Sequence, residues 1–140
     1  MSEENCRLTI VGKQVLPGGD TETTKTCAQG VHRVLENGLH ELIYRNEKDD
    51  TDNRLLLGPG RVEVYKTGSQ KTRFLFTQGG DYNAVYETPY GSLEMRIETE
   101  HIALMTVDGG LRGQVRYRLT MDGSYTVLST VMIRAEALSS

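Results

Sequence analysis

The chain has 140 residues, enough for one domain with a substantial core, and its 37% hydrophobic and 25% charged residues are typical of a globular protein. Its net charge of −3 gives no electrostatic reason to expect nucleic acid or an anionic membrane as a partner. We therefore predict a single domain over residues 1–140 that binds neither.

The start of the chain predicts a cytoplasmic protein. Residues 1–5 are polar and acidic, unlike a signal peptide, and no apolar run approaches the roughly 18 residues that a membrane span needs. In that compartment Cys6 and Cys27 are expected as free thiols, and the sequence leaves open whether they ever pair.

The first third of the chain predicts strands separated by glycine-containing turns. Residues 7–16 alternate weakly between apolar and polar and stop at Pro17-Gly18-Gly19-Asp20. Residues 21–29 are polar and rich in threonine, which is typical of an exposed edge strand. Asn37-Gly38 lies between two alternating runs over residues 31–46 and predicts a hairpin.

The inner face of this first hairpin is left open by the sequence, because both faces carry apolar groups. Val31, Leu35, Leu42 and Tyr44 form the more apolar set.

Residues 47–53 form a charged stretch that we interpret as a solvated loop. Its aspartates invite comparison with a calcium site, but the glycine and the final glutamate of an EF-hand loop are missing. Gly58-Pro59-Gly60 then predicts a break between two strands.

From residue 61 onwards, apolar side chains alternate through strands joined by short turns. We expect these turns at residues 67–69, 79–81, 98–101, 108–110 and 122–123. The second turn is expected to pair the strand of Phe76 with the strand of Ala84. A two-residue turn at Asp122-Gly123 is expected to put Leu128 and Met132 inside and Val127 and Val131 outside.

The run Tyr82–Glu98 sets the parity for this half of the chain. It predicts two alternating strands around Pro89-Tyr90, with Thr88 opposite Gly91 and Tyr86 opposite Leu93. One face stays apolar through seven consecutive strands of this kind, and long helical periodicity is absent. Such a sheet curls or closes to remove its edges, so we predict an all-β, antiparallel up-and-down barrel of eight to ten strands, lipocalin-like or calycin-like.

The stretch Tyr86–Met95, together with Thr99 and a basic hairpin near the end of the chain, resembles the YwiB-like family of bacterial proteins. Its most recognisable part is the Thr88-Pro89-Tyr90-Gly91 turn between two alternating strands, and the resemblance covers residues 8–133. It implies a calycin-like β-barrel, akin to lipocalins, in a cytoplasmic bacterial protein. It implies no activity and no catalytic residues.

The sequence contains no recognisable catalytic motif. A nucleophile elbow, a phosphate-binding loop and a Cys-x-x-Cys pair are all absent, so no catalytic residue, metal ligand or cofactor is predicted. His32, His40 and His101 are far apart in the sequence, and parity places His101 outside the barrel. Arg112, Arg116 and Arg118 are interpreted as a solubilising outer stripe rather than a phosphate contact.

The predicted inner face carries the candidate site. We expect a ligand-binding set formed by Phe74, Phe76, Tyr82, Tyr86, Met95 and Tyr117. A buried tyrosine needs a hydrogen-bond partner, and a small barrel either fills with side chains or holds one small ligand. The leading hypothesis is thus a small, largely apolar ligand inside the barrel. The alternatives are a filled barrel that associates weakly through residues 21–29, and an enzyme, which would need a charged inward residue.

Overall fold

The computed structural model describes residues 4–69, 71–123 and 125–138, and within them the chain forms ten strands. The strands are β1 Cys6–Val15, β2 Thr21–Val34, β3 His40–Asn46, β4 Thr51–Gly58, β5 Arg61–Gly68, β6 Thr72–Thr77, β7 Asp81–Thr88, β8 Gly91–Val107, β9 Gly110–Met121 and β10 Tyr125–Ala137. Within these residues, a helix with the length and apolar character of a membrane span is not found.

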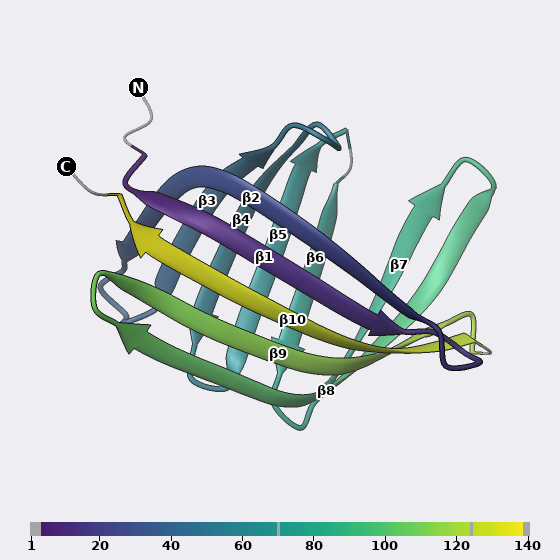
Figure 1. The fold of residues 1–140 in the computed structure, drawn as a ribbon. Helices are drawn as coiled ribbons and strands as arrows, with labels where there is room; N and C mark the ends of the chain where they lie inside the picture. Colours follow the sequence, from purple (N-terminus) through teal and green to yellow (C-terminus); the bar gives the residue numbers. More distant parts are fainter. Residues whose placement is uncertain (1–3, 70, 124, 139–140) are drawn as a thin grey trace.

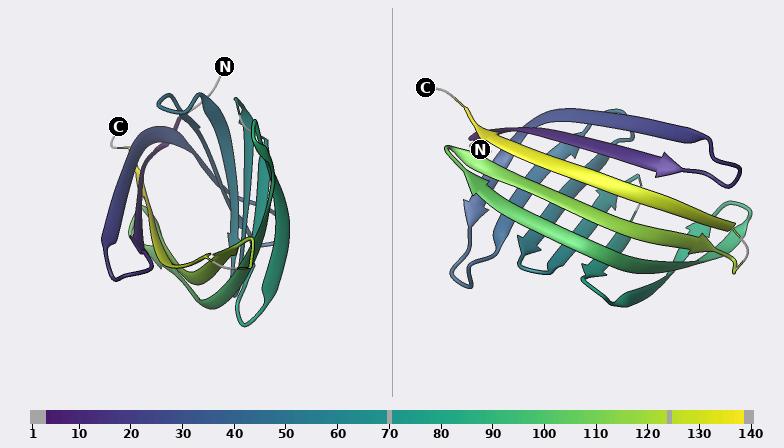
Figure 2. Two further views of the ribbon diagram at one scale, coloured as in Figure 1. Left: turned by 90° about the vertical axis from the view of Figure 1, so that its right-hand side faces the viewer. Right: turned by 60° about the horizontal axis from the view of Figure 1, so that its bottom comes forward.

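All ten strands belong to one antiparallel sheet with the order β6-β5-β4-β3-β2-β1-β10-β9-β8-β7. Figure 1 shows β3 to β6 crossing the direction of β1, β10 and β9, and the end-on view in Figure 2 shows the sheet curling around an interior. The prediction of an all-β, antiparallel up-and-down barrel is confirmed.

The barrel is nearly closed where the β6–β7 turn meets β8. The Gly79 amide donates to the Thr99 carbonyl at 2.9 Å, and the Thr99 amide donates to the Gly80 carbonyl at 3.0 Å. The Ile102 amide donates to the Gln78 side chain at 3.0 Å. Beyond this turn β6 and β7 diverge (Figure 1), and the Tyr82 hydroxyl donates to the Arg73 carbonyl at 3.3 Å between them.

Two strands take part in both halves of the barrel. In β2, residues Thr21 to Gly30 pair with β1, whereas Gly30 to Val34 pair with β3. In β8, the first half pairs with β7, and a β-bulge between Thr99 and His101 marks the passage to a segment that pairs only with β9. Glycines and bulges at such positions allow a strand to bend around a barrel corner.

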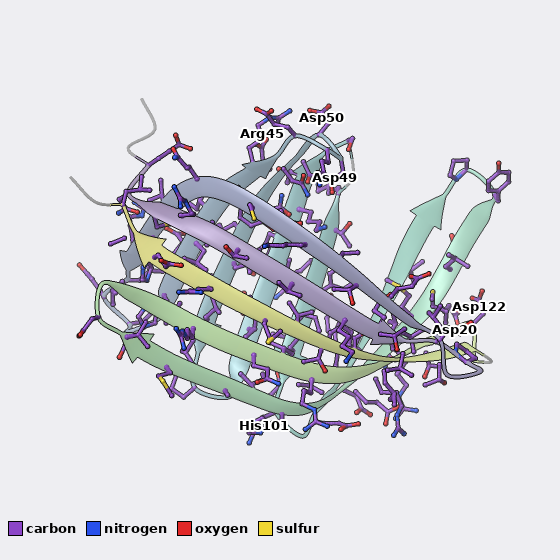
Figure 3. The ribbon with its side chains drawn as sticks, in the orientation of Figure 1. Asp20, Arg45, Asp49, Asp50, His101 and Asp122 are labelled. Atoms are coloured by element: carbon purple, nitrogen blue, oxygen red, sulfur yellow. The ribbon has the colours of Figure 1, made fainter. Side chains whose placement is uncertain are left out.

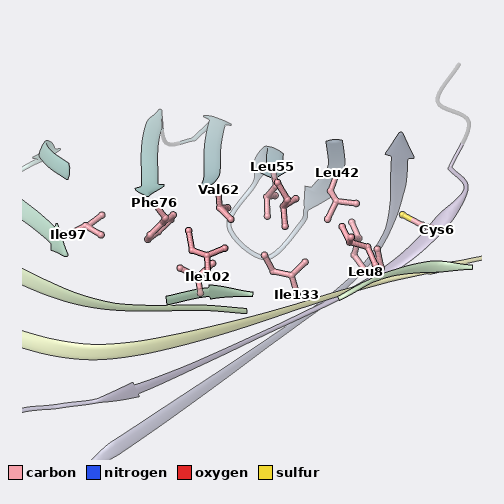
Figure 4. Packing of buried hydrophobic residues seen from close by; sticks show 13 residues of the cluster. Cys6, Leu8, Leu42, Leu55, Val62, Phe76, Ile97, Ile102 and Ile133 are labelled. Atoms are coloured by element: carbon pink, nitrogen blue, oxygen red, sulfur yellow. The ribbon is translucent and has the colours of Figure 1, made fainter. Parts of the chain in front are cut away.

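The core lies between the two crossing halves of the sheet. Leu55, Val62 and Phe76 point from one layer toward Ile102 and Ile133 of the other, as Figure 4 shows. Because side chains alternate in direction along each strand, these positions fix which residues face the interior.

The hairpin expected at Tyr82–Glu98 is confirmed in its register. Thr88 lies opposite Gly91, Tyr86 opposite Leu93, and Tyr82 opposite Ile97. The Asn37-Gly38 turn is confirmed as well: Gly38 has φ 86°, and the Leu39 amide donates to the Asn37 side chain at 3.0 Å. A positive φ explains why glycine is preferred at this position.

One expected strand pairing and one expected turn are wrong, because a regular alternation does not say which strands are neighbours or where a strand ends. β6 and β7 do not form a ladder but stand at the two ends of the sheet order, so Phe76 has no partner at Ala84. The turn expected at residues 98–101 is the β-bulge within the continuous strand β8.

The expected inner face of the last strand is also wrong. Met121 pairs with Tyr125, so three residues connect β9 to β10 where two were expected, and the register shifts by one. As a result Val127 is buried, whereas Leu128 and Met132 are 46% and 47% exposed. A one-residue shift moves every side chain to the opposite face of the sheet.

We predict that Gly30→Ala will destabilise the fold by about 2 kcal/mol, a typical cost of overpacking a core. A Cβ atom at this corner of β2 would lie 2.2 Å from the Ile43 carbonyl oxygen and 3.0 Å from Leu8 Cδ1. Gly12→Ala is the control, because its Cβ would meet only the exposed Thr24 side chain, at 3.0 Å. Urea unfolding of both variants checks this prediction. Equal midpoints for Gly30→Ala and wild type would contradict the claim that the bend in β2 requires a glycine at this position.

Candidate functional site

A partly open cavity of about 220 Å³ lies between the two crossing halves of the barrel. The residues that line it come from seven strands, and most of them are apolar. They are Ile10, Tyr44, Leu55, Val62, Val64, Lys66, Phe74, Phe76, Val115, Tyr117, Val131 and Ile133. This volume is large enough for a small molecule to enter.

Three residues of the expected ligand-binding set line this cavity. The ring centroids of Phe74 and Phe76 are 6.5 Å apart, and those of Phe76 and Tyr117 are 4.8 Å apart. Burial raises the pKa of Tyr117, although the neighbouring Ser129 hydroxyl partly offsets this rise. The Tyr117 phenol therefore stays neutral at physiological pH and can donate a hydrogen bond.

The other three residues of the expected set lie elsewhere or outside the described side chains. Tyr82 packs against the edge of the core, and its hydroxyl is directed at the Arg73 carbonyl. Met95 is buried beside Ala84 in a separate hollow at the β7–β8 hairpin. The side chain of Tyr86 lies outside the described part of the structure. Ligand binding by these residues therefore stays a prediction.

A row of polar side chains crosses the inner face, and we call it the polar row; two of its four members, Tyr44 and Lys66, line the cavity. It consists of four residues that are cross-strand neighbours on β3 to β6: Tyr44, Asn53, Lys66 and Thr72. Side chains directly opposite each other on neighbouring strands lie about 5 Å apart at Cβ. The adjacent row, formed by Leu42, Leu55, Val64 and Phe74, is entirely apolar.

Two atoms of the polar row have unused hydrogen-bonding capacity. Asn53 Oδ1 and Thr72 Oγ1 are buried, and neither has a hydrogen-bond partner among the described residues. The Asn53 amide nitrogen, in contrast, donates to Thr51 Oγ1 at 3.0 Å. A buried polar atom without a partner costs free energy, so this row can gain from a bound polar group.

Asp49 supplies the negative charge at this end of the barrel. Its carboxylate lies 4.0 Å from Lys66 Nζ and accepts a hydrogen bond from the Thr51 hydroxyl. Burial and the Asp49 charge together raise the pKa of Tyr44 to about 12, so its phenol is neutral. Figure 3 shows Asp49 with Arg45 and Asp50 at the β3–β4 turn.

The sequence interpretation missed Lys66 as an inward charge. The signal was present, because Lys66 continues the alternation of Val62 and Val64 on the same strand. Asn53 was assigned to a charged loop, whereas it lies in β4 and is 2% exposed. Its alternation with Thr51 and Leu55 could have placed it on the inner face.

The comparisons with known proteins agree with this architecture. A model of a domain of unknown function, DUF1934, matches residues 8–133 of the chain. The chain belongs to the DUF1934 family. The resemblance to the YwiB-like family is thereby confirmed, over the residues expected from the sequence.

The DUF1934 fold is also found in a solved structure. The chain is similar to the crystal structure of the ywiB protein from Bacillus subtilis, with a TM-score of 0.72 and 20% sequence identity. The match covers 99% of this chain and 96% of the other. At this identity the likeness shows the fold alone. A search of curated proteins gave no match.

The histidines are only partly brought together. His32 Nε2 lies 3.0 Å from His40 Nδ1 on the inner side of β2 and β3, whereas His101 is exposed on the outside, as Figure 3 shows. Burial and the neighbouring His40 lower the pKa of His32. Among the described residues, no group of three histidine, cysteine, aspartate or glutamate side chains could hold a metal ion.

The outer face of β3 to β5 carries a charged network that is unrelated to the cavity. The Glu41 carboxylate is only 3% exposed and accepts hydrogen bonds from Arg33 and, at 2.6 Å, from Arg54. Glu63 accepts from Arg61 and Tyr65 in the same way. Burial would raise the pKa of Glu41, but the hydrogen bonds and charges of the two arginines outweigh it and lower that pKa.

We predict that Glu41→Gln will lower the free energy of unfolding at neutral pH by about 1 kcal/mol, a small value because both arginines are half exposed. The folded pKa lies below the unfolded one, so this stabilisation is present above the ordinary value of 4.5 and is lost as the pH falls through the folded pKa. Urea unfolding should show the difference shrinking on acidification.

The control for this prediction is Glu136→Gln. Glu136 pairs with Arg134 at 2.8 Å, but both side chains are about half exposed, so little change is expected at any pH. A Glu41→Gln variant with the same stability as wild type at neutral pH would show that the buried carboxylate contributes nothing.

Proposed function

We propose that this DUF1934 protein is a binding protein that holds a small, largely apolar molecule inside its barrel. The observation that carries the proposal is the cavity of about 220 Å³, of which nine of the twelve lining residues are apolar. Engineered apolar cavities of about 150 Å³ bind benzene, so this volume suits a molecule of one ring or a short chain.

The apolar lining supports an occupant. A ligand that displaces water from this lining gains free energy because apolar surface is buried. A ligand that binds only the folded protein would also raise its stability.

The proposal includes a reducing compartment, namely the cytoplasm. Cys6 and Cys27 are both free, and Cys27 is exposed. An exposed, unpaired thiol fits a reducing compartment better than an oxidising one.

We expect 1-hexanol to bind the wild-type protein and to shift the methyl NMR signals of the cavity residues Val64, Val115 and Val131. Val131→Phe should fill the cavity and abolish these shifts, since a phenyl ring would occupy the space. Met132→Phe is the matched control, because Met132 is the next residue along β10 and its side chain is 47% exposed on the outer face.

Native mass spectrometry of the protein purified from its own host provides the second measurement. A small molecule that co-purifies with wild type and is missing from Val131→Phe would support the proposal.

The NMR experiment can contradict the proposal in two ways. If 1-hexanol shifts signals over the outer surface, or shifts the same signals equally in Val131→Phe, the cavity is excluded as the binding site.

A further inference from the structure

The polar row indicates which class of molecule the cavity suits, an inference that rests on the proposed binding function. Among the described residues that line the cavity, Lys66 is the one that carries a charge, and it comes from the inner face of β5. Its side chain is 30% exposed, so the amine lies toward the open end rather than at the bottom of the barrel.

The charge of Lys66 is only weakly satisfied. Its nearest carboxylate, Asp49, is 4.0 Å away, which is longer than a charge-assisted hydrogen bond of about 2.8 Å. Asp49 is itself held by the Thr51 hydroxyl. A ligand carboxylate could therefore approach the amine more closely than Asp49 does.

The neighbours of Lys66 in the polar row suit the same group. Thr72 lies directly opposite Lys66 and beside the cavity, and its buried hydroxyl has no hydrogen-bond partner among the described residues. The neutral Tyr44 phenol is a second donor in the row.

We infer that the barrel takes a small amphiphile with a carboxylate head, whose apolar part fills the cavity while its head meets Lys66. A single lysine suits a singly charged carboxylate better than a phosphate, which proteins bind through several cationic or amide donors. The cavity of about 220 Å³ limits the apolar part to a short chain or one ring.

The test compares hexanoate with hexanamide, which has the same chain and a neutral head, by isothermal titration at neutral pH. Wild type should bind hexanoate about tenfold or more tightly than hexanamide, since a hydrogen bond between two charged groups is stronger than one to a neutral amide. Lys66→Met should remove this preference and leave hexanamide binding within about twofold of wild type.

Asp49→Asn provides a second variant with the opposite expected effect. Because it removes the carboxylate that competes for Lys66, it should tighten hexanoate binding severalfold and leave hexanamide unchanged. If Lys66→Met does not fold, the Asp49→Asn variant and the preference of wild type still decide the question.

The outcomes separate the two proposals. Equal binding of hexanoate and hexanamide, with neither variant changing their ratio, would overturn the carboxylate inference and leave the apolar cavity as the binding site. Absence of binding by hexanoate, hexanamide and 1-hexanol alike would overturn both.

Discussion

Every second side chain of each strand must face the same interior. This requires the sheet to bend at β2 and β8, the two strands that belong to both halves of the barrel. At Gly30 the lack of a Cβ lets β2 approach the Ile43 carbonyl, which no other residue could do without a shift. At the bulge after Thr99, one extra residue keeps Ile97, Thr99 and Ile102 all buried although their spacing is irregular. The cavity lies between the two halves that cross at these bends.

The interior combines an apolar cavity with one charged group at its end. Burying a lysine amine without a partner is costly, and Lys66 avoids most of this cost because its side chain stays partly exposed and lies near Asp49. The outer network around Glu41 follows the opposite arrangement, since two arginines donate directly to its buried carboxylate. The fully satisfied network stabilises the fold, whereas the incompletely satisfied row can respond to a ligand.

The fold class and the β7–β8 register could be predicted because period-two alternation and turn chemistry are local properties. The register of β10 could not, because this strand is apolar on both faces: Val127 and Ile133 face inward while Leu128 and Met132 face outward. The prediction that β6 pairs with β7 was wrong for a different reason. Both strands present apolar side chains to the same interior, so alternation is satisfied whether or not they are hydrogen-bonded neighbours.

The candidate site could be predicted only for its apolar part. Phe74, Phe76 and Tyr117 were identified because aromatic residues on an inner face are visible in the alternation of single strands. The polar row depends instead on the alignment of Asn53, Lys66 and Thr72 across three strands, which the sequence does not encode locally. Each residue alone resembles an ordinary polar position near a turn. Their alignment places one lysine amine next to two oxygens that have no hydrogen-bond partner among the described residues. These neighbouring polar groups favour a ligand with a polar head over a purely apolar one.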